Sequence, residues 1–145
     1  MSNNPVAEEL KILLADSYAL YLKTQNYHWN VEGENFKALH LMFEEQYTDL
    51  AAAIDEIAER IRALGHKAPG SWKSYAEVSN IKDGDEDKDA KSMVKELAED
   101  QKIISSTLNQ LIKTAQKAGD EVTIGLAVDR LTVHEKAGWM LSASV

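Results

Sequence analysis

A chain of 145 residues, 44% hydrophobic and 28% charged, fits a single globular domain with a sizeable core. The net charge of −8 argues against broad nucleic-acid binding and favours cations as partners, and the lack of cysteine excludes disulfides and thiolate sites. The start, MSNNPVAEEL, lacks the basic and apolar regions of a signal peptide, and no apolar run approaches the ~20 residues of a membrane span, so we expect a cytoplasmic protein without a membrane partner.

Two long helices are predicted in the first half of the chain. Asn4–Pro5 is typical of an N-cap followed by proline at the first helical position. Gly33 is expected to end the first helix in a left-handed turn, and Asn35 to cap a second helix that ends near Gly65. The apolar and small side chains at helical spacing are Leu10, Leu13, Leu14, Ser17, Tyr21, Thr24, His28 and Val31, then Phe36, Leu39, Phe43, Leu50, Ile54, Ile57, Ile61 and Leu64.

The helical pattern is interrupted between residues 66 and 87 and then returns twice. Ser71 is expected to cap a short helix in this connection, which ends in an acidic loop. A third long helix stops at Gly119, and Asp120 is expected to cap a fourth. The apolar side chains of these helices are Met93, Leu97, Ile103, Ile104, Leu108 and Leu111, then Val122, Leu126, Val133, Ala137 and Met140. A connection this long lets the second and third helices run parallel. We therefore expect an all-α, ferritin-like four-helix bundle, with a short extra helix in the crossover and one domain over residues 1–145.

Four side chains in the first two helices are the best indication of chemistry. His28 and His40 are followed, on the second predicted helix, by Asp55 and Glu59. Imidazoles and carboxylates together are a ligand set for iron or zinc. Asp55 and Glu59 are four residues apart, so they project from one helix face and can bind the same ion. A lone helical histidine is more often a packed or surface residue, and an isolated acidic pair is usually solvated. The ordered set is what favours a metal site.

The spacing of these residues implies a second copy of the chain. Fifteen residues of helix separate His40 from Asp55, which is about 22 Å, so one ion cannot bind both within one chain. Either the set is accidental or the site is shared. If two copies of the helix lie antiparallel about a two-fold axis near residues 48–49, His40 of one copy meets Asp55 and Glu59 of the other, and His28 joins from the first helix.

Several short segments carry a specific resemblance. They are Tyr27-His28-Trp29-Asn30-Val31-Glu32-Gly33, Asn35-Phe36, Leu39-His40, Asp55-Glu56-Ile57-Ala58-Glu59-Arg60-Ile61, and His134-Glu135-Lys136 with Trp139-Met140-Leu141. In these segments the chain resembles the Dps family of mini-ferritins, named as DNA-binding proteins from starved cells. The resemblance implies a hollow dodecamer built from two-fold dimers, with an iron-oxidising site at each dimer interface. Its iron ligands would be His28 and His40 of one subunit with Asp55 and Glu59 of its mate.

The same resemblance implies a reaction. Fe(II) would be oxidised to Fe(III), with hydrogen peroxide favoured over dioxygen, and stored inside the shell as a ferric oxyhydroxide core. This ferroxidase activity would protect the cell from oxidative stress as well as store iron. Trp29, next to a ligand, could be a sacrificial electron donor or simply an aromatic residue at the dimer contact. Glu44, one turn beyond His40, could support the ligands or bind through water; a plain surface carboxylate is at least as probable.

Two departures from the family pattern concern the pores and DNA. Iron-entry pores are expected to be lined by carboxylates near the start of the last helix. Asp120 and Glu121 could serve, while Gly125 stands where a further acidic residue is often found, and Asp129 could compensate. DNA-binding Dps proteins commonly use a lysine-rich terminal tail, because phosphate contacts need clustered cations. The first basic residue here is Lys11 and the chain ends in Leu-Ser-Ala-Ser-Val, so we expect weak or no DNA binding.

Three rival functions can be weighed from the sequence. A di-iron carboxylate protein with its site inside one bundle needs Glu-x-x-His, and none of the four histidines has a glutamate three residues before it. A nucleoid-associated protein that binds and condenses DNA is the main alternative, and the lack of a basic tail counts against it. A metal-free helical assembly is the third. His66 is expected in a solvated loop, and His134 in a structural hydrogen bond.

Overall fold

The computed structural model describes residues 4–145 and contains five helices. They are α1 (Pro5–Asn30), α2 (Phe36–Ala63), α3 (Trp72–Val78), α4 (Ala90–Ala118) and α5 (Glu121–Ser142), and no strand occurs within residues 4–145. Residues 1–3 lie outside the described residues. They belong to the predicted domain and to the segment where no signal peptide is expected. None of the five described helices combines the length and the apolar character needed to cross a membrane.

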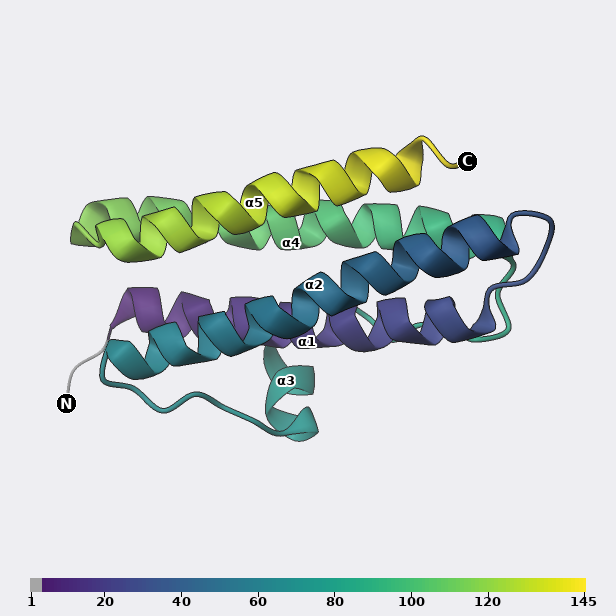
Figure 1. Cartoon of the computed structure of the whole chain (residues 1–145). Helices are drawn as coiled ribbons and strands as arrows, with labels where there is room; N and C mark the ends of the chain where they lie inside the picture. Colours follow the sequence, from purple (N-terminus) through teal and green to yellow (C-terminus); the bar gives the residue numbers. More distant parts are fainter. Residues whose placement is uncertain (1–3) are drawn as a thin grey trace.

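The four long helices form the expected bundle, with α3 in the crossover (Figure 1). Helix α1 packs against α2, α3 and α4, and α5 packs mainly against α4. The chain leaves the end of α2, passes through α3 beside the middle of α1, and returns to the opposite end of the bundle before α4 begins (Figure 1). Helices α2 and α4 therefore run parallel, which confirms the ferritin-like arrangement predicted from the length of the connection.

Most of the predicted helix ends are confirmed by their capping bonds. The Asn4 side chain accepts hydrogen bonds from the backbone N–H groups of Val6 and Ala7 at 3.0 and 3.2 Å, with Pro5 at the first helical position. Ser71 caps α3 and Asp120 caps α5 through their side-chain oxygens. Gly119 ends α4 at φ 68°, the left-handed conformation that glycine adopts without a Cβ clash.

The link between α1 and α2 differs from the expectation. Helix α1 already ends at Asn30, because Val31 turns into an extended conformation and buries its side chain in the core. Gly33 has φ 120° but lies in the following turn, where its carbonyl accepts from the N–H of Phe36 at 3.1 Å. Asn35 is the N-cap residue of α2, yet its side chain makes no capping bond. This short, tight link places the end of α1 beside the start of α2.

The core contains most of the apolar side chains predicted for the first three long helices, but Phe36 is exposed. Its fully buried large side chains include Leu10, Leu13, Leu14, Phe43, Ile57, Ile61, Met93, Leu97 and Ile104. The prediction for α5 was wrong in part: Val122, Val133 and Met140 are exposed, while Arg130 and His134 are buried. Apolar side chains surround α5, so the helical period alone does not identify which stripe faces α4.

The buried polar side chains of α5 form a hydrogen-bonded group. His134 Nδ1 lies 2.7 Å from Gln101 Oε1, and its Nε2 lies 3.0 Å from Nη2 of Arg130, which also contacts Asp49 Oδ2 at 2.9 Å. Arg130 can only donate, so His134 Nε2 accepts and Nδ1–H donates. Burial, reinforced by the charge of Arg130, lowers the pKa of His134 to about 3. The expected structural role of His134 is confirmed.

A second buried polar group joins α1 to α4. Lys23 Nζ lies 2.8 Å from Asp100 Oδ2 and 3.1 Å from Glu96 Oε1, and Tyr27 donates to Glu96 at 2.7 Å. Burial would raise the pKa of Glu96, but hydrogen bonds from Lys88, Tyr27 and Lys23 outweigh it and lower that pKa to about 2. Burial raises the pKa of Asp100. The buried ammonium of Lys23 therefore pairs with both carboxylates, and Lys88 pairs with Glu96 as well.

Candidate metal centre

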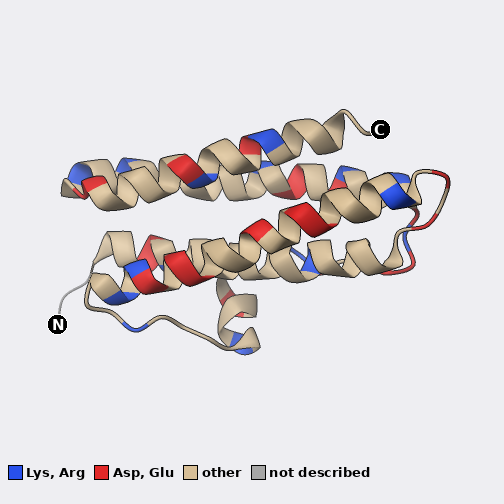
Figure 2. Cartoon of the chain, in the orientation of Figure 1, with Lys and Arg blue, Asp and Glu red and all other residues tan. Residues whose placement is uncertain are grey.

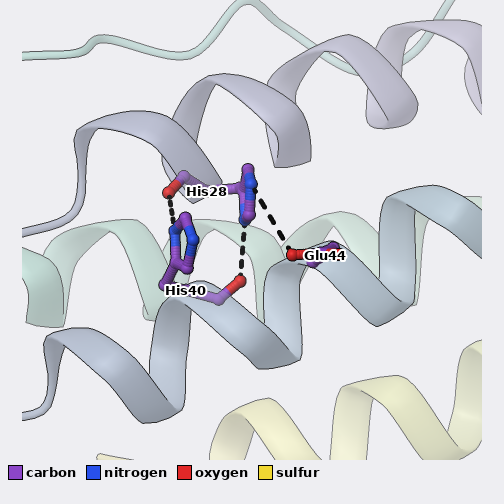
Figure 3. A group of neighbouring side chains, drawn as sticks. All are labelled: His28, His40 and Glu44. Carbon is purple, nitrogen blue, oxygen red and sulfur yellow. Dashed lines mark hydrogen bonds and ion pairs between the residues drawn. The ribbon is translucent and has the colours of Figure 1, made fainter.

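The two histidines predicted as ligands lie against each other. His28 is in the last turn of α1 and His40 is near the start of α2, so the tight link between these helices brings them together (Figure 3). Their rings are stacked, with centroids 3.8 Å apart and planes inclined by 14°. His28 is almost fully buried and His40 is partly exposed. The pair forms one compact imidazole surface at the end of the α1–α2 hairpin.

Hydrogen bonds that the rings donate to backbone carbonyl oxygens orient both imidazoles. His28 Nδ1 lies 2.8 Å from the carbonyl oxygen of His40, and His40 Nδ1 lies 2.7 Å from the carbonyl oxygen of His28 (Figure 3). A carbonyl oxygen only accepts, so each Nδ1 carries the proton and donates it. In the neutral ring, Nε2 then keeps its lone pair, which is the form that binds a metal ion. The reciprocal bonds thus assign the tautomer of both imidazoles.

Glu44 extends this pair into a group of three possible ligands. Its Oε1 lies 4.0 Å from His28 Nε2, and one donor atom from each of His28, His40 and Glu44 lies within 4.8 Å of the others (Figure 3). Glu44 is exposed on α2, one turn beyond His40. Two imidazoles and a carboxylate form a mixed nitrogen and oxygen set that suits iron or zinc. Glu44 is close to the imidazoles, and its role beside a bound ion stays a prediction.

The other two predicted ligands remain apart from this group. Asp55 and Glu59 lie exposed on α2, and among residues 4–145 neither joins the cluster of His28, His40 and Glu44. Helix α2 is unbroken from Phe36 to Ala63, so the separation of about 22 Å between His40 and Asp55 applies in the folded chain. Within one copy, the two imidazoles therefore lie too far from the two carboxylates for one ion to bind both sets.

Two aromatic side chains beside the histidines were not predicted from the sequence to be part of the site. Phe36 stacks on His40 with ring centroids 5.0 Å apart, and Tyr47 meets His28 edge-on at 5.1 Å. Tyr47 lies seven residues after His40, so both project from one side of α2, and this spacing is the signal that could have identified it. Trp29 is exposed next to His28. The imidazoles are thus enclosed by aromatic rings on α2.

Comparisons with known proteins identify the family. Residues 7–145 match the ferritin-like domain family. DNA protection during starvation protein 2 of Bacillus anthracis is 40% identical over 141 residues, which is 97% of this chain and 97% of that protein. The solved structure of Dps from Staphylococcus aureus has a TM-score of 0.94 and 35% identity, and covers 99% of this chain and 97% of that one.

The chain belongs to the Dps family of mini-ferritins. A Dps protein from Bacillus brevis has a TM-score of 0.95 at 33% identity, covering 99% of this chain and 98% of that one. The Dps protein of Vibrio cholerae, described as a member of a broad superfamily of ferritin-like diiron-carboxylate proteins, has a TM-score of 0.91 at 37% identity, covering 95% of this chain and 87% of that one. The resemblance noted in the sequence is confirmed, and with it the fold.

The carboxylates predicted to line a Dps iron-entry pore differ in their surroundings. Asp120 is mostly enclosed: it accepts from Arg60 at 2.8 Å and from the Thr123 hydroxyl at 2.6 Å. Burial would raise the pKa of Asp120, but these bonds and the Arg60 charge lower it. Glu121 and Asp129 are exposed on α5. The pore stays a prediction, and Glu121 and Asp129 are the carboxylates that remain accessible for it.

Proposed function

We propose that this Dps-family protein is a ferroxidase that oxidises Fe(II) to Fe(III) at sites shared between two subunits and stores the ferric product. The observation that carries the proposal is the His28–His40 pair, whose backbone bonds hold both Nε2 lone pairs free for an ion. The diiron-carboxylate description of the Vibrio cholerae relative supports iron as the metal. Iron is here the substrate, delivered as Fe(II) and retained as an oxyhydroxide core.

The proposed assembly follows from the separation along α2 of His40 from Asp55 and Glu59, which we propose form the two halves of a shared site. An antiparallel pair of α2 helices, related by a two-fold axis near residues 48–49, places Asp55 and Glu59 of one subunit opposite His28 and His40 of the other. Each dimer then contains two equal sites. We propose that these dimers build a hollow dodecamer in the cytoplasm, with the ferric core inside it.

The ligand set fits the change in iron oxidation state. The two imidazoles are neutral donors that bind Fe(II), and the carboxylates supply hard, anionic oxygens that stabilise Fe(III). Two Fe(II) ions give one electron each to hydrogen peroxide, which takes up two protons and leaves as two waters. We propose peroxide as the preferred oxidant over dioxygen, because this paired step consumes peroxide without releasing radicals. That chemistry protects the cell from oxidative stress.

The test is stopped-flow oxidation of Fe(II) with peroxide and with dioxygen, alongside a mass measurement by size exclusion. We expect a dodecamer that oxidises Fe(II) faster with peroxide. The variant His28→Gly with His40→Gly should lose the activity, while His66→Ala, which removes a loop histidine outside the proposed ligand set, should keep it. Full activity in the double variant, or in a monomer, would refute the proposal.

A DNA-condensing role is the second candidate, because the Bacillus anthracis relative is named for DNA protection during starvation. The net charge of −8 opposes it, and Lys and Arg are interspersed with Asp and Glu along the described helices (Figure 2). Phosphate contacts need clustered cations. We therefore propose weak or absent DNA binding. A gel-shift assay at low salt checks this, and tight binding there would restore the DNA-condensing role.

A further inference from the structure

A continuous series of aromatic rings connects the candidate metal centre to the crossover helix α3. Tyr47 contacts His28 with ring centroids 5.1 Å apart, and Tyr47 and Tyr21 are 5.8 Å apart. Tyr21 and Tyr18 are 5.9 Å apart, and Tyr18 and Trp72 are 5.4 Å apart. Every step is an edge-on contact between neighbouring rings. We call Tyr47, Tyr21, Tyr18 and Trp72 the aromatic series.

The helix geometry explains why these rings lie in one row. Tyr18, Tyr21 and His28 are separated by three and seven residues, so they share one face of α1. Tyr47 reaches this face from α2 and touches both Tyr21 and His28. Helix α3 lies against the middle of α1 (Figure 1), where Trp72 meets Tyr18. Three helices thus contribute to a single path.

The members of the aromatic series are the side chains that lose one electron most readily. A tyrosine that is oxidised also releases its phenolic proton, so it needs a proton acceptor. Tyr18, Tyr21 and Tyr47 are each partly exposed. Their hydroxyl oxygens are not buried without a hydrogen-bond partner, so water can take the proton and return it. Trp72 is 62% exposed and can release its indole proton to solvent.

We propose that the aromatic series carries oxidising equivalents from the metal centre to Trp72. The inference rests on the proposed ferroxidase function. It concerns the case in which peroxide meets a single Fe(II), which supplies only one of the two electrons that peroxide needs. Trp72 supplies the second electron through Tyr18, Tyr21 and Tyr47, each tyrosine being oxidised and then reduced again.

This reaction balances in electrons and atoms. One H2O2, one Fe(II), one Trp72 indole and one proton from solvent give one Fe(III), two waters and a neutral Trp72 radical. The indole contributes one electron and its N–H proton. A thiol, as a one-electron reductant, restores Trp72; without one, dissolved dioxygen converts the radical into an oxygenated indole. The histidine ligands are spared, because the oxidising equivalent leaves their surroundings.

The chain contains matched controls for this proposal. Its three tryptophans have similar exposure in the folded chain: Trp72 is 62% exposed, Trp29 61% and Trp139 66%. Neither Trp29 nor Trp139 has a ring partner in the described part of the chain, whereas Trp72 contacts Tyr18. Oxidants that diffuse through solvent would reach the exposed Trp139 as well as Trp72, whereas a relay of electrons selects Trp72. Tyr47→Phe keeps the ring and removes the oxidisable phenol.

The experiment uses the assembled protein with about one Fe(II) per site and excess peroxide, without thiol. Peptide mass spectrometry measures the oxygenation of each tryptophan, and freeze-quench electron paramagnetic resonance detects the radical. We expect preferential oxygenation of Trp72, reduced at least about tenfold in Tyr47→Phe because a large barrier is added to one step. Oxygenation of Trp139 should be the same in both proteins.

The outcomes separate this proposal from the proposed function. Normal Fe(II) oxidation with unchanged Trp72 oxygenation in Tyr47→Phe overturns the relay and leaves the ferroxidase intact. Equal oxygenation of Trp72 and Trp139 overturns it as well, because it shows that the oxidant diffuses through solvent. If wild-type protein does not accelerate Fe(II) oxidation, the proposed function fails, and the relay fails with it. Loss of the radical signal in Tyr47→Phe, at normal Fe(II) oxidation, supports the relay.

Discussion

Subunit mixing tests the proposed shared site most directly, because each chain would hold only half of it. One variant, His28→Gly with His40→Gly, keeps the carboxylate half. The other, Asp55→Asn with Glu59→Gln, keeps the imidazole half. Each homodimer lacks one half at both of its sites, so each variant alone should be inactive. Both carboxylates are exposed and both replacements preserve side-chain shape, so the second variant should fold normally.

The magnitude follows from the two-fold arrangement. In a mixed dimer, the intact histidines of one chain face the intact carboxylates of the other, while the second site lacks both halves. Random reassociation at equal amounts makes half of the dimers mixed, and each of these has one active site of two. About one quarter of the wild-type activity should therefore return from two inactive proteins.

The assay is stopped-flow Fe(II) oxidation before and after the variants are dissociated and reassociated together. Each variant treated alone is the control for damage during the treatment, and mass measurement confirms that the assembly has re-formed. Activity that stays at zero in a mixed assembly of normal size would refute the shared site. Activity in either variant alone would show that the missing half is not needed.

Three further predictions concern stability. Leu97→Ala, at a fully buried position on α4, should cost about 2–5 kcal/mol of unfolding free energy in a denaturant titration, and a loss below 1 kcal/mol would contradict the assigned core. Folding lowers the pKa of His134 to about 3, so the neutral imidazole contributes fully to stability above pH 6.5, and this contribution is lost as the pH falls. The unfolding free energy should drop by about 2 kcal/mol between pH 6.5 and 5. The drop should be smaller in His134→Gln. Lys23→Met leaves Asp100 and Glu96 without their shared cation and should cost about 3–5 kcal/mol at pH 7, measured by urea unfolding; an unchanged midpoint would contradict the buried ion pairs.

The sequence predicted those features that depend on local pattern or on chain length. Helix caps such as Asn4 and Asp120 are local, so residue type and spacing identify them. The separation of His40 from Asp55 depends only on the rise of a helix. It could therefore be calculated from the sequence without a structure. The exposed side of α5 could not be predicted, because its apolar residues surround the helix and only the packing against α4 selects the buried stripe.

The contacts at the candidate metal centre could not be predicted from the sequence, because they depend on tertiary packing as well. That His28 and His40 stack, with each ring bonded to the other residue's carbonyl, depends on how a short link turns α1 into α2. The contact of Tyr47 with both His28 and Tyr21 likewise depends on the register between the two helices. Spacing identifies which residue types are available, whereas tertiary packing determines which of them meet.

In the proposed shared site, the division of the ligands along α2 would link Fe(II) oxidation to assembly. A single chain, with imidazoles at one end of the helix and carboxylates at the other, cannot enclose an ion with both sets. In the proposed site iron binds the dimer more tightly than the free chain, so it stabilises the dimer by mass action, by up to about 2.7 kcal/mol per site at a metal concentration one hundred times the dissociation constant. Each chain carries a net charge of −8, and cations at the interface reduce the repulsion between two such chains. The dimer should therefore dissociate more readily when metal is removed by a chelator, and Asp55→Asn with Glu59→Gln should abolish this difference. A dimer equally stable with and without metal would show that the α2 contact holds without its ligands.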